Sequence, residues 1–198
     1  MDSVALGLFV MSAVSLLGSP GPGIAALIAV GRTAGLARGL RYYAGLQIGL
    51  AAAAGLCAVG LFSLLAAFPD FLRALTIVAA LYLVYLAYRI ATAPVGSALA
   101  GKAPSSAPIA GFLLGVTNPK GYVAFVSLLA SQSILAGAPT EDLFVKWLLI
   151  VAAMIVVDIA WLLAGVALHQ ATLRPRTERA LNLALGAMIL GAAAVSFL

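Results

Sequence analysis

Charged residues are scarce in this sequence, and so are the side chains that bind metals or carry redox chemistry. Charged residues make up 9% of the chain and hydrophobic residues 64%, whereas a soluble domain carries about 25% charged residues. Cys57 is the single cysteine and His169 the single histidine, which excludes an intrachain disulfide, dithiol chemistry and a histidine-rich metal site. The composition therefore predicts an integral membrane protein without a metal site or a cofactor.

Apolar stretches long enough to cross a bilayer fill most of the chain. A span needs about 20 apolar residues, so the 198 residues have room for about six spans and no separate soluble domain. We expect spans at residues 4–30, 40–67, 71–92, 108–136, 143–169 and 177–198. The sequence thus predicts one all-α transmembrane domain, residues 1–198, with halves at about 1–92 and 108–198.

Basic residues gather in alternate connections between these spans. One side holds eight of them: Arg32, Arg38, Arg41, Arg89, Lys102, Arg174, Arg176 and Arg179. The opposite side holds Arg73 and Lys146. By the positive-inside rule both termini lie outside (N-out, C-out), and three spans per half then make the halves a 3+3 inverted repeat. The net charge of +5 is explained by orientation in a lipid bilayer, so we expect no nucleic-acid partner.

Two of the expected spans contain residues that interrupt a straight helix. The first holds Gly18-Ser19-Pro20-Gly21-Pro22-Gly23 and the fourth holds Asn118-Pro119-Lys120. Proline has no N–H, so a helical carbonyl loses its donor, which in hydrocarbon costs several kcal/mol unless protein, water or a ligand satisfies it. Pro20 and Pro119 are 99 residues apart, half of the chain. Paired broken helices in matching halves indicate the binding site of a transporter.

We therefore expect broken first and fourth helices whose breaks bind the substrate. The candidate substrate-binding residues are Ser19, Pro20, Gly21, Pro22, Gly23, Asn118, Pro119 and Lys120. Asn118 has an alternative role, because its side chain is suited to capping the half-helix that starts at Pro119.

Lys120 and Asp158 are the charges that the sequence places deep within spans. A charge at the bilayer centre costs about 2.5–3.5 kcal/mol, so it is usually paired or functional. One interpretation is a structural ion pair between the two side chains. The other is that Asp158 carries the coupling ion or meets a cation, while Lys120 and helix N-termini meet an anion. Both interpretations stay open at this point.

Glycine-rich and polar positions elsewhere have structural explanations. Residues 31–39 are expected to form the turn between the first two spans. Gly45 and Gly49 form a GxxxG pair, which permits close helix packing. Gln47 lies in the same span, and polar packing is its default role.

The chain resembles the LysE/RhtB-type amino-acid exporters of the lysine exporter superfamily over essentially its full length. The resemblance lies in Ser19-Pro20-Gly21-Pro22, the Gly-rich turn with Gly45 and Gly49, Tyr82-Leu83-Val84-Tyr85-Leu86, and Gly115-Val116-Thr117-Asn118-Pro119-Lys120. It implies a six-span, proton-driven antiporter that exports amino acids or similar small zwitterionic metabolites across the bacterial cytoplasmic membrane. This chain departs from the family pattern at Leu50, where members often have an acid, and at Gly23, where a polar residue is common.

Two other functions compete with amino-acid export. A divalent metal-ion exporter of the same superfamily would need several carboxylate, histidine or cysteine ligands, and the spans offer Asp158 as their deep carboxylate. A non-transporting structural bundle would explain the packing glycines but leaves the two breaks without a purpose. An enzyme would need a nucleophile–base or metal cluster, which the spans lack. The sequence leaves open whether the chain forms a homodimer.

Overall fold

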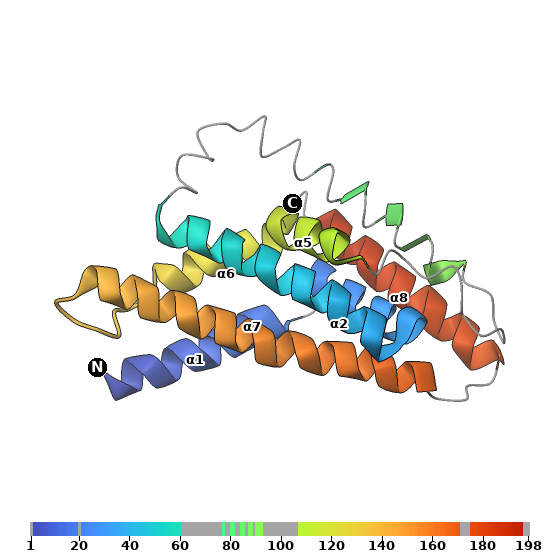
Figure 1. The fold of residues 1–198 in the computed structure, drawn as a ribbon, viewed down its shortest axis with the longest axis horizontal. Helices are drawn as coiled ribbons and strands as arrows, with labels where there is room; N and C mark the ends of the chain where they lie inside the picture. Colours follow the sequence, from blue (N-terminus) through green and yellow to red (C-terminus); the bar gives the residue numbers. More distant parts are fainter. Residues whose placement is uncertain are drawn as a thin grey trace.

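The computed structural model describes residues 2–19, 21–60, 77, 80, 81, 84, 85, 87, 88, 90–92, 107–170 and 175–195. These residues contain six continuous helices and no strand, arranged as an elongated bundle (Figure 1). The predicted all-α class is therefore confirmed for this part of the chain. The predicted third span and the connection that follows it lie largely outside the described residues.

The first two helices contain three helical arms, because α2 folds back on itself. Helix α1 spans Ser3–Gly18, and the Asp2 carboxylate caps it by accepting from the N–H groups of Val4 and Ala5 at 2.9 and 3.1 Å. Helix α2 spans Pro22–Ala58 and reverses at Gly35, whose φ of 73° suits a residue without Cβ. We call residues 22–34 the first arm of α2 and residues 36–58 the second arm.

Neighbours along α2 establish this reversal. A Cβ built on Gly23 would lie 3.8 Å from Leu46, and Gly31 and Gly39 both lie against Leu162 of α7. Residues on either side of Gly35 are thus side by side. The chain therefore reverses within the turn predicted over residues 31–39, but it does so at the single residue Gly35, and the residues on both sides of it are helical.

The second part of the described chain contains two short helices and two long ones. Helix α5 spans Pro108–Thr117 and α6 spans Pro119–Leu129, with a bend of 56° between them. Helix α7 spans Pro139–Gln170 and runs beside α1 and the second arm of α2, and α8 spans Pro175–Val195 (Figure 1).

The connection between α6 and α7 differs from the expected one. The fourth span was predicted to reach residue 136, but α6 ends at Leu129. Asp142 holds the intervening loop by accepting from the Ile134 and Leu135 N–H groups at 2.6 and 2.8 Å. Asp142 also pairs at 3.0 Å with Lys146, which donates to backbone carbonyls of residues 129 and 131. These polar contacts satisfy loop backbone groups that a longer helix would have satisfied internally.

Glycines let α2 and α5 approach backbone to backbone. A Cβ on Gly45 or Gly49 would collide with backbone atoms of α5, and a Cβ on Gly111 or Gly115 would collide with backbone atoms of the second arm of α2. The packing role predicted for Gly45 and Gly49 is thus observed. Its counterpart, a second GxxxG pair on α5, was missed.

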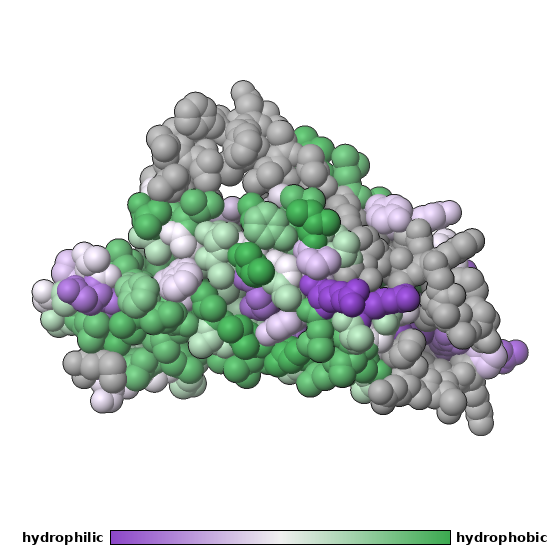
Figure 2. Space-filling view, viewed as in Figure 1, coloured by the Kyte–Doolittle hydropathy of each residue, from purple (hydrophilic) through white to green (hydrophobic). Residues whose placement is uncertain are grey.

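Two described helices are long and apolar enough to cross a membrane, Pro22–Ala58 and Pro139–Leu168, and the bent pair α5–α6 is a third if it forms one span. Of the two arms of α2, only the second, about 34 Å long at 1.5 Å per residue, is long enough to cross a bilayer core of about 30 Å in one direction. Hydrophobic side chains cover most of the visible described surface, and hydrophilic ones gather at the left end and in the right half (Figure 2).

Candidate functional site

The breaks between α1 and α2 and between α5 and α6 have the same local construction. In each, a residue with extended backbone ends one helix, and proline occupies the first position of the next: Pro22 in α2 and Pro119 in α6. Proline is favoured there because the first helical N–H has no partner within the helix. Ser19 and Asn118 supply extended residues at the two breaks, while Pro20 lies outside the described residues.

Lys120 brings the two breaks together in space. It is the second residue of α6, and its Nζ donates a hydrogen bond to the carbonyl of Ser19, the residue that follows α1. The side chain reaches that carbonyl by passing over Gly21: a Cβ on Gly21 would lie 2.6 Å from Lys120 Cδ. The N-termini of α2 and α6 therefore meet, and each presents N–H groups without helical acceptors and the positive end of a helix dipole.

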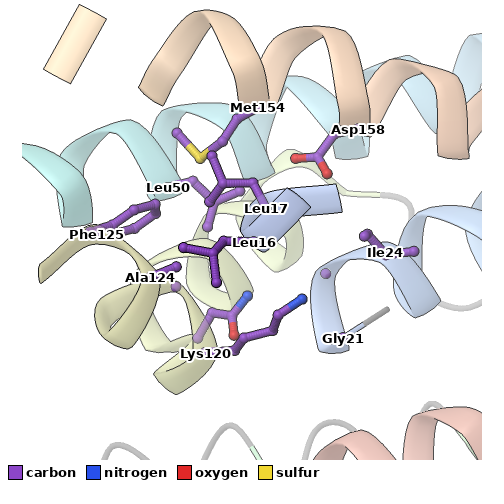
Figure 3. Close-up of a pocket in the computed structure, with 13 residues that line it drawn as sticks. Leu16, Leu17, Gly21, Ile24, Leu50, Lys120, Ala124, Phe125, Met154 and Asp158 are labelled. Carbon is purple, nitrogen blue, oxygen red and sulfur yellow. The ribbon is translucent and has the colours of Figure 1, made fainter. Parts of the chain in front are cut away.

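A cavity with about 420 Å³ of empty space, including its opening, lies beside these helix starts. Figure 3 shows Lys120 extending toward Gly21 on one side of the cavity and Asp158 entering from α7 on another. The lining residues come from α1, both arms of α2, α5–α6 and α7: Leu16, Leu17, Gly21, Gly23, Ile24, Leu50, Asn118, Lys120, Gly121, Ala124, Phe125, Met154 and Asp158.

Asp158 is 6% exposed and accepts a hydrogen bond of 2.7 Å from Gln47 Nε2. The ammonium group of Lys120 is close enough to act on this carboxylate electrostatically. Tyr43, one turn before Gln47, donates to the Ile155 carbonyl at 2.9 Å, so two side chains of the second arm of α2 are bonded to α7. Gln47 was expected to serve polar packing only, and its relation to Asp158 was missed. The signal in the sequence is the pair Tyr43 and Gln47, two polar side chains one helical turn apart in a mostly apolar span.

Asn118 does not act as a side-chain cap. It precedes α6 but makes no capping hydrogen bond, so this alternative for the residue is wrong. Its side chain lines the cavity, it is 7% exposed, and its Oδ1 has no hydrogen-bond partner among the described residues. A buried polar atom without a partner is costly, so this oxygen is suited to a ligand donor.

The candidate site residues predicted from the sequence differ in whether they line this cavity. Five of them line the cavity: Gly21, Gly23, Asn118, Lys120 and Asp158. Ser19 is not among the described lining residues, but its carbonyl accepts the hydrogen bond from Lys120. Pro22 and Pro119 begin the flanking helices without lining the cavity in the described chain.

Lys120 and Asp158 are not the only charges that the fold encloses. Arg32 and Lys146 are each 2% exposed, and Asp142 is buried as well. The sequence predicts Arg32 in the turn between the first two spans, but in the structure it lies in the helical first arm of α2, before the reversal at Gly35. There it donates to Asn182 Oδ1 and lies 3.7 Å from Glu178, both on α8.

Comparison with known proteins identifies the family. The family of LysE type translocators matches residues 14–198, whereas no curated protein and no solved structure matches the chain. This match confirms the resemblance to the LysE/RhtB exporters, and with the long apolar helices it indicates a multi-pass membrane translocator. A match across nearly the entire chain shows membership, so this protein belongs to the LysE type translocator family.

Proposed function

We propose that this protein is a secondary active exporter of amino acids or similar small zwitterionic metabolites, driven by exchange with protons. The observation that carries the proposal is that a cation, Lys120, and a carboxylate, Asp158, occupy different walls of one otherwise mostly apolar cavity. An α-amino acid carries one group of each sign, separated by a single carbon. Its charges therefore match the charges of the cavity.

The carboxylate of the substrate would bind at the two breaks. Lys120, the N–H groups that open α2 and α6, and the two helix dipoles all favour an anion there. Asn118 Oδ1, which has no hydrogen-bond partner within the described chain, accepts hydrogen bonds and would meet the substrate's ammonium group. Candidate substrate contacts are thus Ser19, Gly21, Gly23, Asn118 and Lys120, with Pro20, Pro22 and Pro119 shaping the breaks.

Asp158 would couple export to protons. An ionised Asp158 attracts the ammonium group of the substrate, and a protonated Asp158 does not. Proton and substrate therefore compete for one carboxylate, which is the requirement for exchange. Gln47 donates to this carboxylate and would hold it toward the cavity.

The architecture that we propose is a single transmembrane domain over residues 1–198, built as a 3+3 inverted repeat. The α1–α2 and α5–α6 breaks would be equivalent, as would the second arm of α2 and α7. The basic residues would face the cytoplasm, with both termini outside the bacterial cytoplasmic membrane. Movement of one repeat against the other would expose the cavity to either side.

The competing functions have less support. Among the described residues no group of three or more His, Cys, Asp or Glu side chains is placed to hold a metal ion, and Asp158 is the one such residue that lines the cavity. A structural bundle would not need an uncovered polar oxygen, such as that of Asn118, in a cavity.

Counterflow in proteoliposomes tests the proposal. The purified protein, loaded with unlabelled amino acid, should take up the labelled compound, and an imposed pH gradient should drive accumulation. Lys120→Met keeps the chain length and removes the charge; it should lower exchange by about tenfold or more, because hydrogen bonds to charged groups contribute about 1.5–3 kcal/mol. Absence of exchange for every amino acid offered, with folded protein, would contradict the proposal.

A further inference from the structure

We propose that the exported amino acids have uncharged, apolar side chains, which enter a subsite formed by Leu50, Phe125 and Met154. This inference rests on the proposed export of amino acids and specifies which of them the cavity accepts. The three residues belong to the second arm of α2, to α6 and to α7, respectively. The subsite thus lies where three helices meet.

The cavity has a charged side and an apolar side. In Figure 3, Leu50, Phe125 and Met154 lie together at one side, while Lys120 and Asp158 lie away from them toward the breaks. An amino acid whose two charged groups face Lys120 and Asp158 would direct its side chain away from the breaks. The side chain would then meet the apolar side.

Because its side chains are buried, the apolar side of the cavity should select apolar substrate side chains over charged ones. Leu50, Phe125 and Met154 are all buried and belong to the hydrophobic core. Lys120 and Asp158 are the charged residues among the described lining residues. A charged substrate side chain would lose its hydration there without gaining a counter-charge, whereas an aliphatic one would gain contacts.

Gly121 leaves room beside the subsite. A Cβ on Gly121 would lie 3.3 Å from the ring of Phe125 and 3.6 Å from Leu50. The missing methyl group therefore contributes to the space that a substrate side chain could fill. Gly121 lies in the first turn of α6, where alanine is a better helix former than glycine.

The substrate profile of the reconstituted wild-type protein is the first test. Counterflow is measured at equal concentrations for six labelled compounds: leucine, methionine, alanine, serine, lysine and glutamate. Each measurement is repeated with unlabelled leucine as a competitor. Leucine and methionine should exceed alanine by about tenfold or more, because a methylene in a hydrophobic pocket changes selectivity by about 10–200-fold. Lysine and glutamate should not exchange.

Gly121→Ala is the second test, because it narrows the subsite without removing a charge. The ratio of leucine to alanine counterflow should fall by about tenfold. Gly7→Ala is the matched control: it is the same change in a helix, and nothing lies within 4 Å of the added methyl group. Its ratio should equal that of the wild type.

The outcomes separate the inference from the proposed function. Exchange of serine or lysine as fast as leucine would overturn the apolar subsite and leave amino-acid export standing. An unchanged leucine-to-alanine ratio in Gly121→Ala would overturn the placement of the substrate's side chain beside Leu50, Phe125 and Met154. Failure of all six compounds to exchange would overturn both proposals.

Discussion

Gln47 Nε2 donates a hydrogen bond of 2.7 Å to Asp158 Oδ2, which joins the second arm of α2 to α7 inside the bundle. Gln47 is 9% exposed, and its Oε1 has no hydrogen-bond partner among the described residues. A buried carboxylate depends on such a donor, because neither partner is well hydrated. The amide therefore orients the proposed coupling residue, and Gln47 itself is not among the described residues that line the cavity.

Replacement of Gln47 should impair coupling more than it impairs folding. Gln47→Met keeps the volume and removes the donor, so pH-driven accumulation should fall by about tenfold, the equivalent of a hydrogen bond to a charged group. Tyr43→Phe is the control, because it removes the neighbouring α2–α7 hydrogen bond, whose acceptor is the Ile155 carbonyl and not Asp158. If pH-driven accumulation fell equally in both variants, the hydrogen bonding between α2 and α7, and not the orientation of Asp158, would explain the loss of coupling.

Asp158→Asn should separate exchange from proton coupling. The amide keeps the shape of the carboxyl group but cannot release a proton, so accumulation driven by a pH gradient should be lost while solute exchange partly remains. Both quantities can be measured in the same proteoliposomes. If Asp158 instead served only as a structural partner of Lys120, the double substitution Asp158→Asn with Lys120→Met would restore pH-driven transport.

Pro22→Ala and Pro119→Ala should lower transport while leaving the protein folded. Each proline is the first residue of its helix, and alanine there permits the helix to extend back across the break. Extension would cover backbone groups that we assign to the substrate. Initial rates of counterflow and thermal unfolding in detergent measure the two effects. Wild-type transport in both variants would show that the breaks only bend the chain.

Gly111→Ala should destabilise the bundle strongly. Its Cβ would collide with backbone atoms of Tyr42 and Leu46, which cannot rotate away as a side chain can. Overpacking of this kind costs about 1–3 kcal/mol or more, so the unfolding temperature in detergent should fall clearly. Gly7→Ala, with open space around the added methyl group, should unfold at the wild-type temperature. Equal stability of the two variants would contradict the close approach of α2 and α5.

The proposed orientation predicts which positions react from outside the cell. In a Cys57→Ala background, a single cysteine at position 141, in the first turn of α7, should be labelled by an impermeant thiol reagent in intact cells. A single cysteine at the exposed position 38 should react only after permeabilisation. The reverse pattern would invert the proposed topology.

The parts of this fold that were predicted depend on single residues and their immediate neighbours. Apolar runs determine the membrane class because they cannot be hydrated, and proline determines a helix start because it has no N–H. Proline at positions 22 and 119 thus indicates the helix starts that the structure has at these residues. The predicted helix ends were less accurate. The fourth span was expected to reach residue 136, but α6 ends at Leu129, because Asp142 and Lys146, which come later in the chain, bind the backbone of the loop that follows.

What only the tertiary structure decided is which distant residues meet. The contact of Lys120 with Ser19, the bond between Gln47 and Asp158, and the packing of Arg32 against α8 each join residues about a hundred or more positions apart. The rotation and register of packed helices determine such contacts, and these follow from the close fit of all facing side chains together. The amino-acid sequence by itself therefore determined that helices start at Pro22 and Pro119, and packing decided that residues beside both starts line one cavity.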